Sequence, residues 1–288
     1  MTFNAPYQPP YKELCIYYLK GRIIGDPIVG DEDFIGNWEE AEDSFLFFKQ
    51  PDDGRVQALL AQQPHLALLD RFEMTYEEWQ GGTMEPIRAG RLRVVPAWHA
   101  EAAALAGGDI LLDPGVVFGT GTHPTTYDCL TALQLAFDAR PVAEVLDLGT
   151  GTGLLALAAA RLGARRVLAV DLNRLAAQTA RVNVRTNGMD HRVLVVQGNA
   201  INFMDLSNDL MVSNIHYEVM RHLVVADGFA AQKQFILSGL LRTQAREIEY
   251  QLRRQPVEIL RKWEHEHTWF TYYGRSTRSR GTDAQGGA

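Results

Sequence analysis

Residues 144–173 read EVLDLGTGTGLLALAAARLGARRVLAVDLN, and this stretch decides the fold. A short apolar run ends in three alternating glycines, a segment rich in Ala and Leu follows, and a second apolar run ends at an acid. The first and last parts are typical of buried strands, and the middle part is typical of a helix. Strand, glycine turn, helix and strand form a unit whose two strands lie parallel. The stretch therefore predicts an α/β fold built on a mostly parallel sheet.

The segments that follow continue the alternation of strand and helix. A helix is expected over 174–188, because Asn187 and Gly188 close it with a favourable C-terminal stop. Further strands are expected at 192–200, 209–217 and 233–241, and two strand-like halves are expected within 257–275. The two halves predict a hairpin at one edge, so we expect a Rossmann-like sheet of seven strands.

The N-terminal third has a different pattern. Short strands are expected at 13–19, 43–50 and 65–74, with a helix over 53–63, which predicts a small α+β domain. The segment 21–40 is too rich in glycine and acids to form a convincing helix. The expected layout, in chain order, is a small α+β domain, a linker, the α/β domain and a disordered tail, at residues 1–85, 86–98, 99–275 and 276–288.

Charge is distributed unevenly along the chain. The first 100 residues hold 9 Lys and Arg against 16 Asp and Glu, which accounts for the whole formal net charge of −7. An acidic surface repels phosphate backbones and can attract a basic protein, although an ordinary solvated surface explains it as well. The chain has little basic character, and neutralising phosphates needs clustered Lys and Arg, so we expect no tight binding to nucleic acid. The arginines at 242, 246, 253 and 254 are expected to form a solvated helix face.

The remaining composition favours a cytoplasmic protein. No apolar run reaches about 18 residues, and no basic segment followed by an apolar one opens the chain, so we expect neither a membrane span nor a signal peptide. Cys15 and Cys129 are far apart and lack the spacing of metal ligands, so two reduced thiols are expected. No cluster of potential metal ligands is visible, and no metal is expected.

The glycine turn predicts a nucleotide-like ligand at the carboxyl end of the first strand. Gly149, Gly151 and Gly153 let the backbone approach a ligand closely, and Asp171 stands where an acid can bind the two ribose hydroxyls of an adenosine. The spacing is G-x-G-x-G, whereas dinucleotides need G-x-G-x-x-G. Asp147 would repel a pyrophosphate but suits the ammonium group of a methionine moiety. The residues therefore favour S-adenosylmethionine over NAD.

A second glycine-rich stretch, DPGVVFGTGTHPTT at 113–126, lies about 30 residues upstream and suggests a ligand held from two sides. The two stretches together resemble the bacterial methyltransferases that modify the eleventh protein of the large ribosomal subunit, a family of class I S-adenosylmethionine-dependent methyltransferases. The resemblance covers 79–273 and includes IRAGRLRVVPAW, SNI and LSGLL. It implies a ferredoxin-like N-terminal domain that recognises the protein substrate, and a second domain that methylates lysine side chains and the α-amine.

The resemblance also implies particular site residues. The threonine-rich loop would close over the cofactor, and the family's binding positions correspond to Thr126, Gly149, Asp171 and Asn214. Asn199 follows the third strand and is either a partner for the adenine amino group or a simple turn residue.

His123, in the threonine-rich loop, is a candidate base, although a histidine after a glycine turn more often holds its loop by hydrogen bonds. The chain departs from the family after the fourth strand, where Asn214 is followed by Ile, His216 and Tyr217. The family typically has N-I-L-A there, and N-I-H-Y shifts towards the N-P-P-Y motif of enzymes that methylate amide or nucleobase nitrogens. His216 and Tyr217 are therefore catalytic candidates beside Asn214, and packing at the edge of the site explains them equally well.

Three functions follow from these observations. The first is N-methylation of a ribosomal large-subunit protein on lysine, the α-amine or both. The second is methylation of another protein, an amide, a nucleobase or a small-molecule amine. The third is a catalytically idle cofactor-binding module that acts in ribosome assembly. In either methyltransferase the group transfer is direct, so proximity and orientation supply most of the catalysis.

Overall fold

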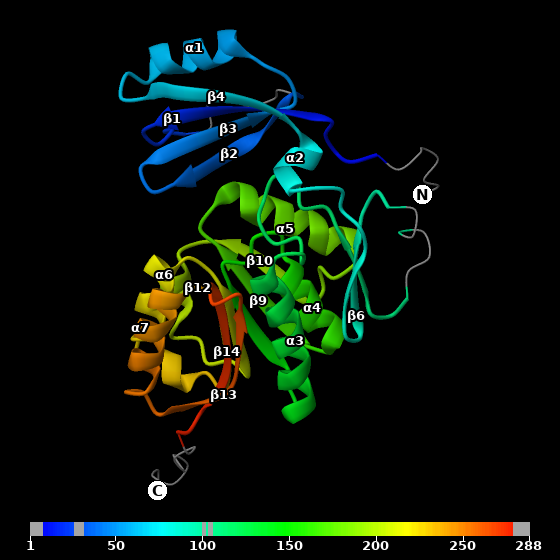
Figure 1. Ribbon diagram of the computed structural model, residues 1–288, viewed down its shortest axis with the longest axis vertical. Coiled ribbons are helices and arrows are strands. Elements are labelled where there is room, and N and C mark those ends of the chain that lie inside the picture. Colours follow the sequence, from blue (N-terminus) through cyan, green and yellow to red (C-terminus); the bar gives the residue numbers. More distant parts are fainter. Residues whose placement is uncertain (1–7, 26–31, 100–101, 103–105, 279–288) are drawn as a thin grey trace, which may run out of the picture.

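The computed structural model describes residues 8–25, 32–99, 102 and 106–278. A small body formed by the N-terminal sheet lies against a larger body that holds the other two sheets (Figure 1). None of the helices in these described ranges is long and apolar enough to cross a membrane.

The largest sheet has seven strands in the order β10-β9-β8-β11-β12-β14-β13. The five strands β8 to β12 are parallel, whereas β14 runs antiparallel to both β12 and β13. The predicted parallel sheet with a hairpin at one edge is therefore confirmed. Its strands are β8 (Glu144–Leu148), β9 (Arg166–Asp171), β10 (Val193–Gln197), β11 (Leu210–Asn214), β12 (Gln234–Leu241), β13 (Val257–His265) and β14 (Trp269–Ser276).

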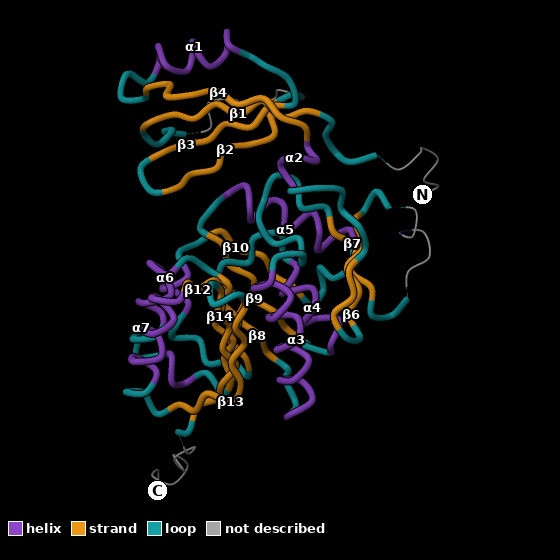
Figure 2. The backbone as a smooth tube through the Cα atoms, in the orientation of Figure 1, coloured by secondary structure: helices purple, strands orange, loops and turns teal. Residues whose placement is uncertain are grey.

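Helices cover both faces of this sheet (Figure 2). One face packs under α3 (Pro124–Ala139), α4 (Leu154–Leu162) and α5 (Arg174–Thr186). The other packs under α6 (Tyr217–Leu223), α7 (Arg242–Leu252) and the short 3₁₀ turns η2 (Ala200–Phe203) and η3 (Phe229–Ala231). The strand order reverses between β8 and β11, and a ligand crevice forms where strand order reverses, at the carboxyl ends of the strands.

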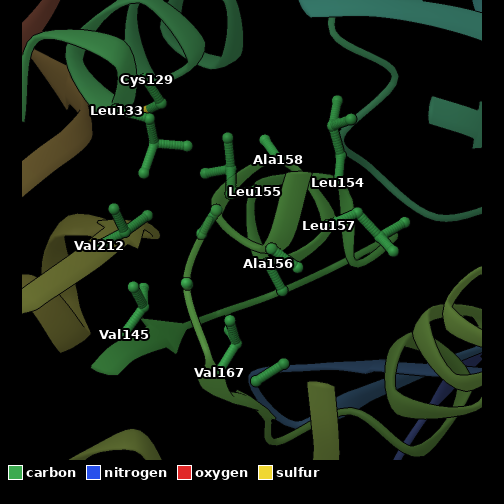
Figure 3. Packing of buried hydrophobic residues seen from close by; sticks show 14 of the residues in the cluster. Cys129, Leu133, Val145, Leu154, Leu155, Ala156, Leu157, Ala158, Val167 and Val212 are labelled. Carbon is green, nitrogen blue, oxygen red and sulfur yellow. The ribbon is translucent and has the colours of Figure 1, made fainter. Parts of the chain in front are cut away.

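Helix α4 lies deep in the core because its sequence is almost entirely Leu and Ala. Seven of its nine residues are buried, and small alanine side chains let the helix lie close to the sheet and to α3. Figure 3 shows Leu154, Leu155 and Leu157 among Cys129 and Leu133 of α3 and Val145, Val167 and Val212 of the sheet. This packing fixes the position of the glycine turn that connects β8 to α4.

The variant Leu157→Ala tests how much the packing around α4 contributes to the free energy of unfolding. Leu157 is fully buried, so truncation loses the transfer free energy of the side chain and leaves a cavity. We expect the free energy of unfolding to fall by about 2–5 kcal/mol, measured by urea denaturation. A loss below about 1 kcal/mol would show that neighbouring side chains move in to fill the cavity and that the core is packed more loosely than described.

The stretch 86–98, expected as a linker and domain entry with a strand at RLRVV, is regular structure over much of its length. It contains β5 (Ile87–Ala89) and β6 (Leu92–Pro96), which form a three-stranded sheet with β7 (Asp109–Leu112). The residues Leu92, Val94 and Val95 are buried. Across β6 and β7, Arg93 forms a largely buried ion pair with Asp109. This pairing depends on a strand further along the chain and was not visible in the local pattern.

The small sheet has the order β2-β3-β1-β4 with every neighbouring pair antiparallel. Its elements are β1 (Glu13–Lys20), β2 (Phe34–Glu40), β3 (Asp43–Phe48), α1 (Asp53–Gln62) and β4 (Ala67–Thr75), followed by α2 (Tyr76–Gln80). This is the ferredoxin-like strand order, with α1 as its crossover helix between β3 and β4. The described residues between β1 and β2 form no helix, so the expected degenerate ferredoxin-like unit is confirmed.

The face of the small sheet opposite α1 packs against the larger body. Leu14, Ile16 and Phe47 form a cluster with Val116, Val117, Leu175 and Ala176. Gly36 allows this approach, because a Cβ atom there would lie 2.6 Å from Leu175 Cδ1. The small body therefore contacts the start of α5 and the loop at 113–123.

The tail was expected at 276–288. Its first residue, Ser276, ends β14, and residues 279–288 lie outside the described residues.

Candidate active site

The glycine turn after β8 forms the floor of the candidate cofactor site. Gly149, Gly151 and Gly153 all have left-handed backbones, with φ of 78°, 54° and 84°. A Cβ atom on Gly151 would lie 2.7 Å from the carbonyl oxygen of Phe118, so a side chain does not fit there. The turn therefore lies directly against the second glycine-rich loop, as the two motifs suggested.

Asn183 of α5 ties the two glycine-rich loops together. Its Nδ2 donates to the carbonyl oxygens of Asp113 at 2.8 Å and Thr152 at 2.9 Å, and its Oδ1 accepts from the Asp113 amide at 2.9 Å. The Thr152 hydroxyl also donates to the Gly119 carbonyl at 2.8 Å. These bonds join segments that lie about 30 residues apart in the chain.

Asp147 is fully buried at the end of β8. Its Oδ2 accepts from the Thr150 hydroxyl at 2.6 Å, whereas Oδ1 has no hydrogen-bond partner within the part of the chain that the structure describes. Burial raises the pKa of this carboxyl to about 7, and the nearby charge of Asp171 adds to the shift. A buried acceptor atom without a donor is open to a cationic ligand group.

Asp171 ends β9 and faces the same turn. Its Oδ2 accepts from the Gly151 amide and its Oδ1 from the Asn173 amide, both at 2.9 Å. Burial raises its pKa, and the two backbone donors oppose the shift. Each carboxylate oxygen has a further lone pair, so Asp171 can hold the turn and still accept from a ribose hydroxyl.

Asn214 ends β11 and faces the start of α3. Its Nδ2 donates to the Thr126 hydroxyl at 3.3 Å and to the Thr125 hydroxyl at 3.4 Å. Gly239 in β12 lies beside it with φ of 85°, and a Cβ there would lie 3.0 Å from Asn214 Oδ1. Thr125 and Gly239 were not singled out from the sequence, although the HPTT and LSGLL motifs contain them.

The other two catalytic candidates lie just beyond Asn214. His216 is exposed and occupies the N-cap position of α6, but its side chain makes no capping hydrogen bond. Tyr217 is partly buried against the hydrophobic cluster under α6 and α7. Asn214, His216 and Tyr217 thus lie together where β11 ends and α6 begins, and their catalytic roles stay predictions.

Asn199 lies at the end of β10, one strand from Asp171. Its Oδ1 accepts from the Ile201 amide at 3.1 Å and so caps η2. This bond matches the turn role weighed for Asn199, and the adenine contact stays a prediction.

His123 caps α3 and holds its loop. Its Nδ1 lies 2.7 Å from the Thr125 hydroxyl oxygen, and its ring meets Phe118 and Trp269 edge to face, with centroid distances of 5.3 and 4.9 Å. Burial lowers the pKa of His123, and the nearby His265 adds to the shift, so the neutral imidazole is favoured. The geometry matches a loop-holding role.

The sheet order, with its antiparallel edge hairpin and a glycine turn flanked by two acids at the switch point, is a Rossmann-like arrangement of the kind that binds a nucleotide-like ligand. The family model described as Ribosomal protein L11 methyltransferase (PrmA) matches residues 41–277. The chain therefore belongs to this family.

Individual relatives agree with this assignment. The chain is 38% identical over 183 residues to a ribosomal protein L11 methyltransferase of Listeria monocytogenes, and 37% over 185 residues to one of Geobacillus thermodenitrificans. These alignments cover 62% of this chain, which spans 57–58% of the length of the two relatives. A crystal structure of the ribosomal protein L11 methylase of Lactobacillus delbrueckii subsp. bulgaricus matches with a TM-score of 0.56 and 28% identity, covering 68% of this chain and 99% of that one.

Proposed function

We propose that this protein is an S-adenosylmethionine-dependent N-methyltransferase that modifies lysine side chains, the α-amine, or both, of a ribosomal large-subunit protein. The observation that carries the proposal is the juxtaposition of Asp147, the glycine turn and Asp171 with Asn214 at one edge of the sheet. Family membership supports the choice of acceptor.

The residues present fit the cofactor. The buried Oδ1 of Asp147, which has no hydrogen-bond partner among the described residues, suits the ammonium of the methionine moiety, and Asp171 suits the ribose hydroxyls. Gly149 and Gly151 bring the turn close to Ile215 and to the Phe118 carbonyl, where a Cβ atom would not fit, and Thr126 lies within hydrogen-bond distance of Asn214. When bound, S-adenosylmethionine supplies an electrophilic methyl group on its sulfonium.

The chain's own residues then orient the acceptor amine. Oδ1 of Asn214 is its acceptor atom, and the hydrogen bonds of Nδ2 to Thr125 and Thr126 hold that amide in one orientation. A lysine must be neutral to attack, and partial exclusion of water at this edge lowers the pKa of an ammonium. His216 and Tyr217 border the same edge and would contact the acceptor or its flanking residues.

We further propose that residues 1–85 recognise the protein substrate. This segment is acidic, which favours a basic partner and disfavours tight binding to nucleic acid. It also contacts the glycine-rich loop at 113–123, because the Tyr76 hydroxyl and Gln80 Nε2 both donate to the Gly115 carbonyl, at 2.8 and 2.9 Å. A ribosomal substrate and two free, buried cysteines are consistent with a cytoplasmic protein.

Intact-mass spectrometry of the eleventh large-subunit protein from the same organism tests the function. Incubation with this protein and S-adenosylmethionine should add mass in steps of one methyl group, and the number of steps counts the methyls. The Asp171→Ala variant should add none. No mass change, with cofactor binding intact in the same sample, would exclude this acceptor and favour an amide, nucleobase or small-molecule amine. An inactive protein that still binds its ribosomal partner would favour the assembly module.

A further inference from the structure

A buried carboxylate outside the cofactor site joins α3 to the edge hairpin. Asp128 lies in the second turn of α3 with only 4% of its side chain exposed, and its Oδ1 lies 2.9 Å from Nε2 of His265. His265 ends β13, 137 residues further along the chain. A buried carboxylate is unfavourable unless it is paired, and His265 opposes the rise in the pKa of Asp128 that burial causes.

The hairpin turn that follows His265 is strained. Glu266 and His267 have φ of 49° and 56°, the left-handed region that side chains with a Cβ atom seldom adopt. The Thr268 amide closes the turn by donating to the His265 carbonyl at 2.8 Å. Such conformations persist where surrounding contacts hold them, and they are often found near functional sites.

A second contact fastens the same turn to the start of α3. Trp269, the first residue of β14, meets the His123 ring edge to face, with centroids 4.9 Å apart. His123 in turn holds Thr125, whose hydroxyl accepts from Asn214. The hairpin turn is thus connected to Asn214, the residue proposed to orient the acceptor amine, through the side chains of His123 and Thr125.

The strand register places this turn at the same edge of the sheet as Asn214. Asn214 of β11 lies opposite Ser238 of β12, and Leu241, three positions further on, lies opposite Trp269. Three residues of a strand span roughly 10 Å. Because β14 runs antiparallel to β12, the turn before β14 lies at the carboxyl ends of the parallel strands, where the acceptor must enter.

We propose that Asp128 and His265 form a latch that holds Trp269 against His123, and that both are positioning residues for the methyl acceptor. This inference rests on the proposed function, since it assigns the latch to the acceptor side of the same site. The latch acts through Trp269, His123 and Thr125 on Asn214, and its two residues lie outside the part of the cofactor site formed by Asp147, the glycine turn and Asp171. Its loss should therefore weaken use of the acceptor and spare cofactor binding.

Two conservative variants test the latch, and a histidine of the same turn supplies the control. Asp128→Asn keeps the shape of the side chain and removes its charge, and His265→Gln removes the imidazole. His267→Asn changes an exposed residue that pairs with Glu264 and does not touch α3, and asparagine tolerates the left-handed backbone. The first readout is the indole N–H signal of Trp269 in ¹⁵N NMR spectra without acceptor, assigned with Trp269→Phe.

We expect the Trp269 signal to move in both latch variants and to stay in place in His267→Asn. With the ribosomal protein as acceptor, kcat/KM should fall about tenfold in either latch variant, because the acceptor is misplaced. The dissociation constant for S-adenosylmethionine should not change. The two substitutions combined should cost no more than either alone, and Asp128→Asn should have no further effect in a Trp269→Phe protein.

Two results would overturn the latch: an unchanged Trp269 signal in both variants, or a parallel loss of cofactor affinity that reveals a general effect on folding. If the wild-type protein transfers no methyl group, the proposed function fails. The indole signals still decide in that case whether Asp128 and His265 hold Trp269.

Discussion

Asp171→Ala should abolish useful cofactor binding, with the dissociation constant for S-adenosylmethionine rising by a factor on the order of 100. The carboxylate accepts from the backbone amides of Gly151 in the glycine turn and of Asn173 at the start of α5, so its removal leaves both donors unsatisfied. Hydrogen bonds from the ribose to a charged oxygen are worth about 1.5–3 kcal/mol each, and a loss of about 3 kcal/mol corresponds to a 100-fold weaker complex.

Isothermal titration calorimetry measures this change, and two further variants define its cause. Asp171→Asn keeps one acceptor oxygen and should lose about tenfold in affinity. Asp190→Ala removes an exposed carboxylate of the same body and should bind as the wild type does. Binding by Asp171→Ala within about threefold of wild type would contradict the assignment of Asp171 to the ribose.

Cofactor affinity should rise with pH up to about 7 because of Asp147. Burial raises the pKa of this carboxyl to about 7, so below that pH the free protein holds a proton there. A ligand ammonium favours the carboxylate, and binding must therefore expel the proton. The affinity should increase about tenfold per pH unit below pH 7, and should decline again where the ligand amine deprotonates, near 7.7–8.0.

Calorimetry at pH 6 in buffers of different ionisation enthalpy should detect release of about one proton on binding, and uptake of a proton above about pH 8, where the ligand amine is neutral in solution. Asp147→Asn cannot titrate, so its affinity should be lower and nearly independent of pH over this range. A slope that survives in Asp147→Asn would assign the proton to another group.

The same shift acts on the stability of the unliganded protein. The folded protein retains the Asp147 proton up to about pH 7, whereas the unfolded chain releases it near the ordinary value of 3.8. The free energy of unfolding should therefore fall as the pH rises from about 4 to about 7, by an amount that Asp147→Asn removes.

The amino-acid sequence by itself determined the parallel sheet, the edge hairpin and the glycine turn at 149–153 that forms the candidate cofactor site. These depend on local signals: apolar runs of strand length, glycines at fixed spacing and an acid at the end of each of the strands β8 and β9. Asp147, Gly151 and Asp171 meet because the carboxyl ends of adjacent parallel strands share one edge. Strand direction and spacing are enough to predict that meeting.

Only the tertiary structure decided the remaining features. Residues 86–98 form strands because β6 finds its partner in β7, and no local pattern reports that pairing. Asn199 caps η2, and Tyr217 packs against the hydrophobic cluster under α6 and α7. Asp128 and His265 are separated by 137 residues, and they come into contact only because the fold brings α3 beside the end of β13. A residue's burial and its hydrogen-bond partners come from distant segments, so the roles that depend on them follow from the packed structure and not from the order of the residues.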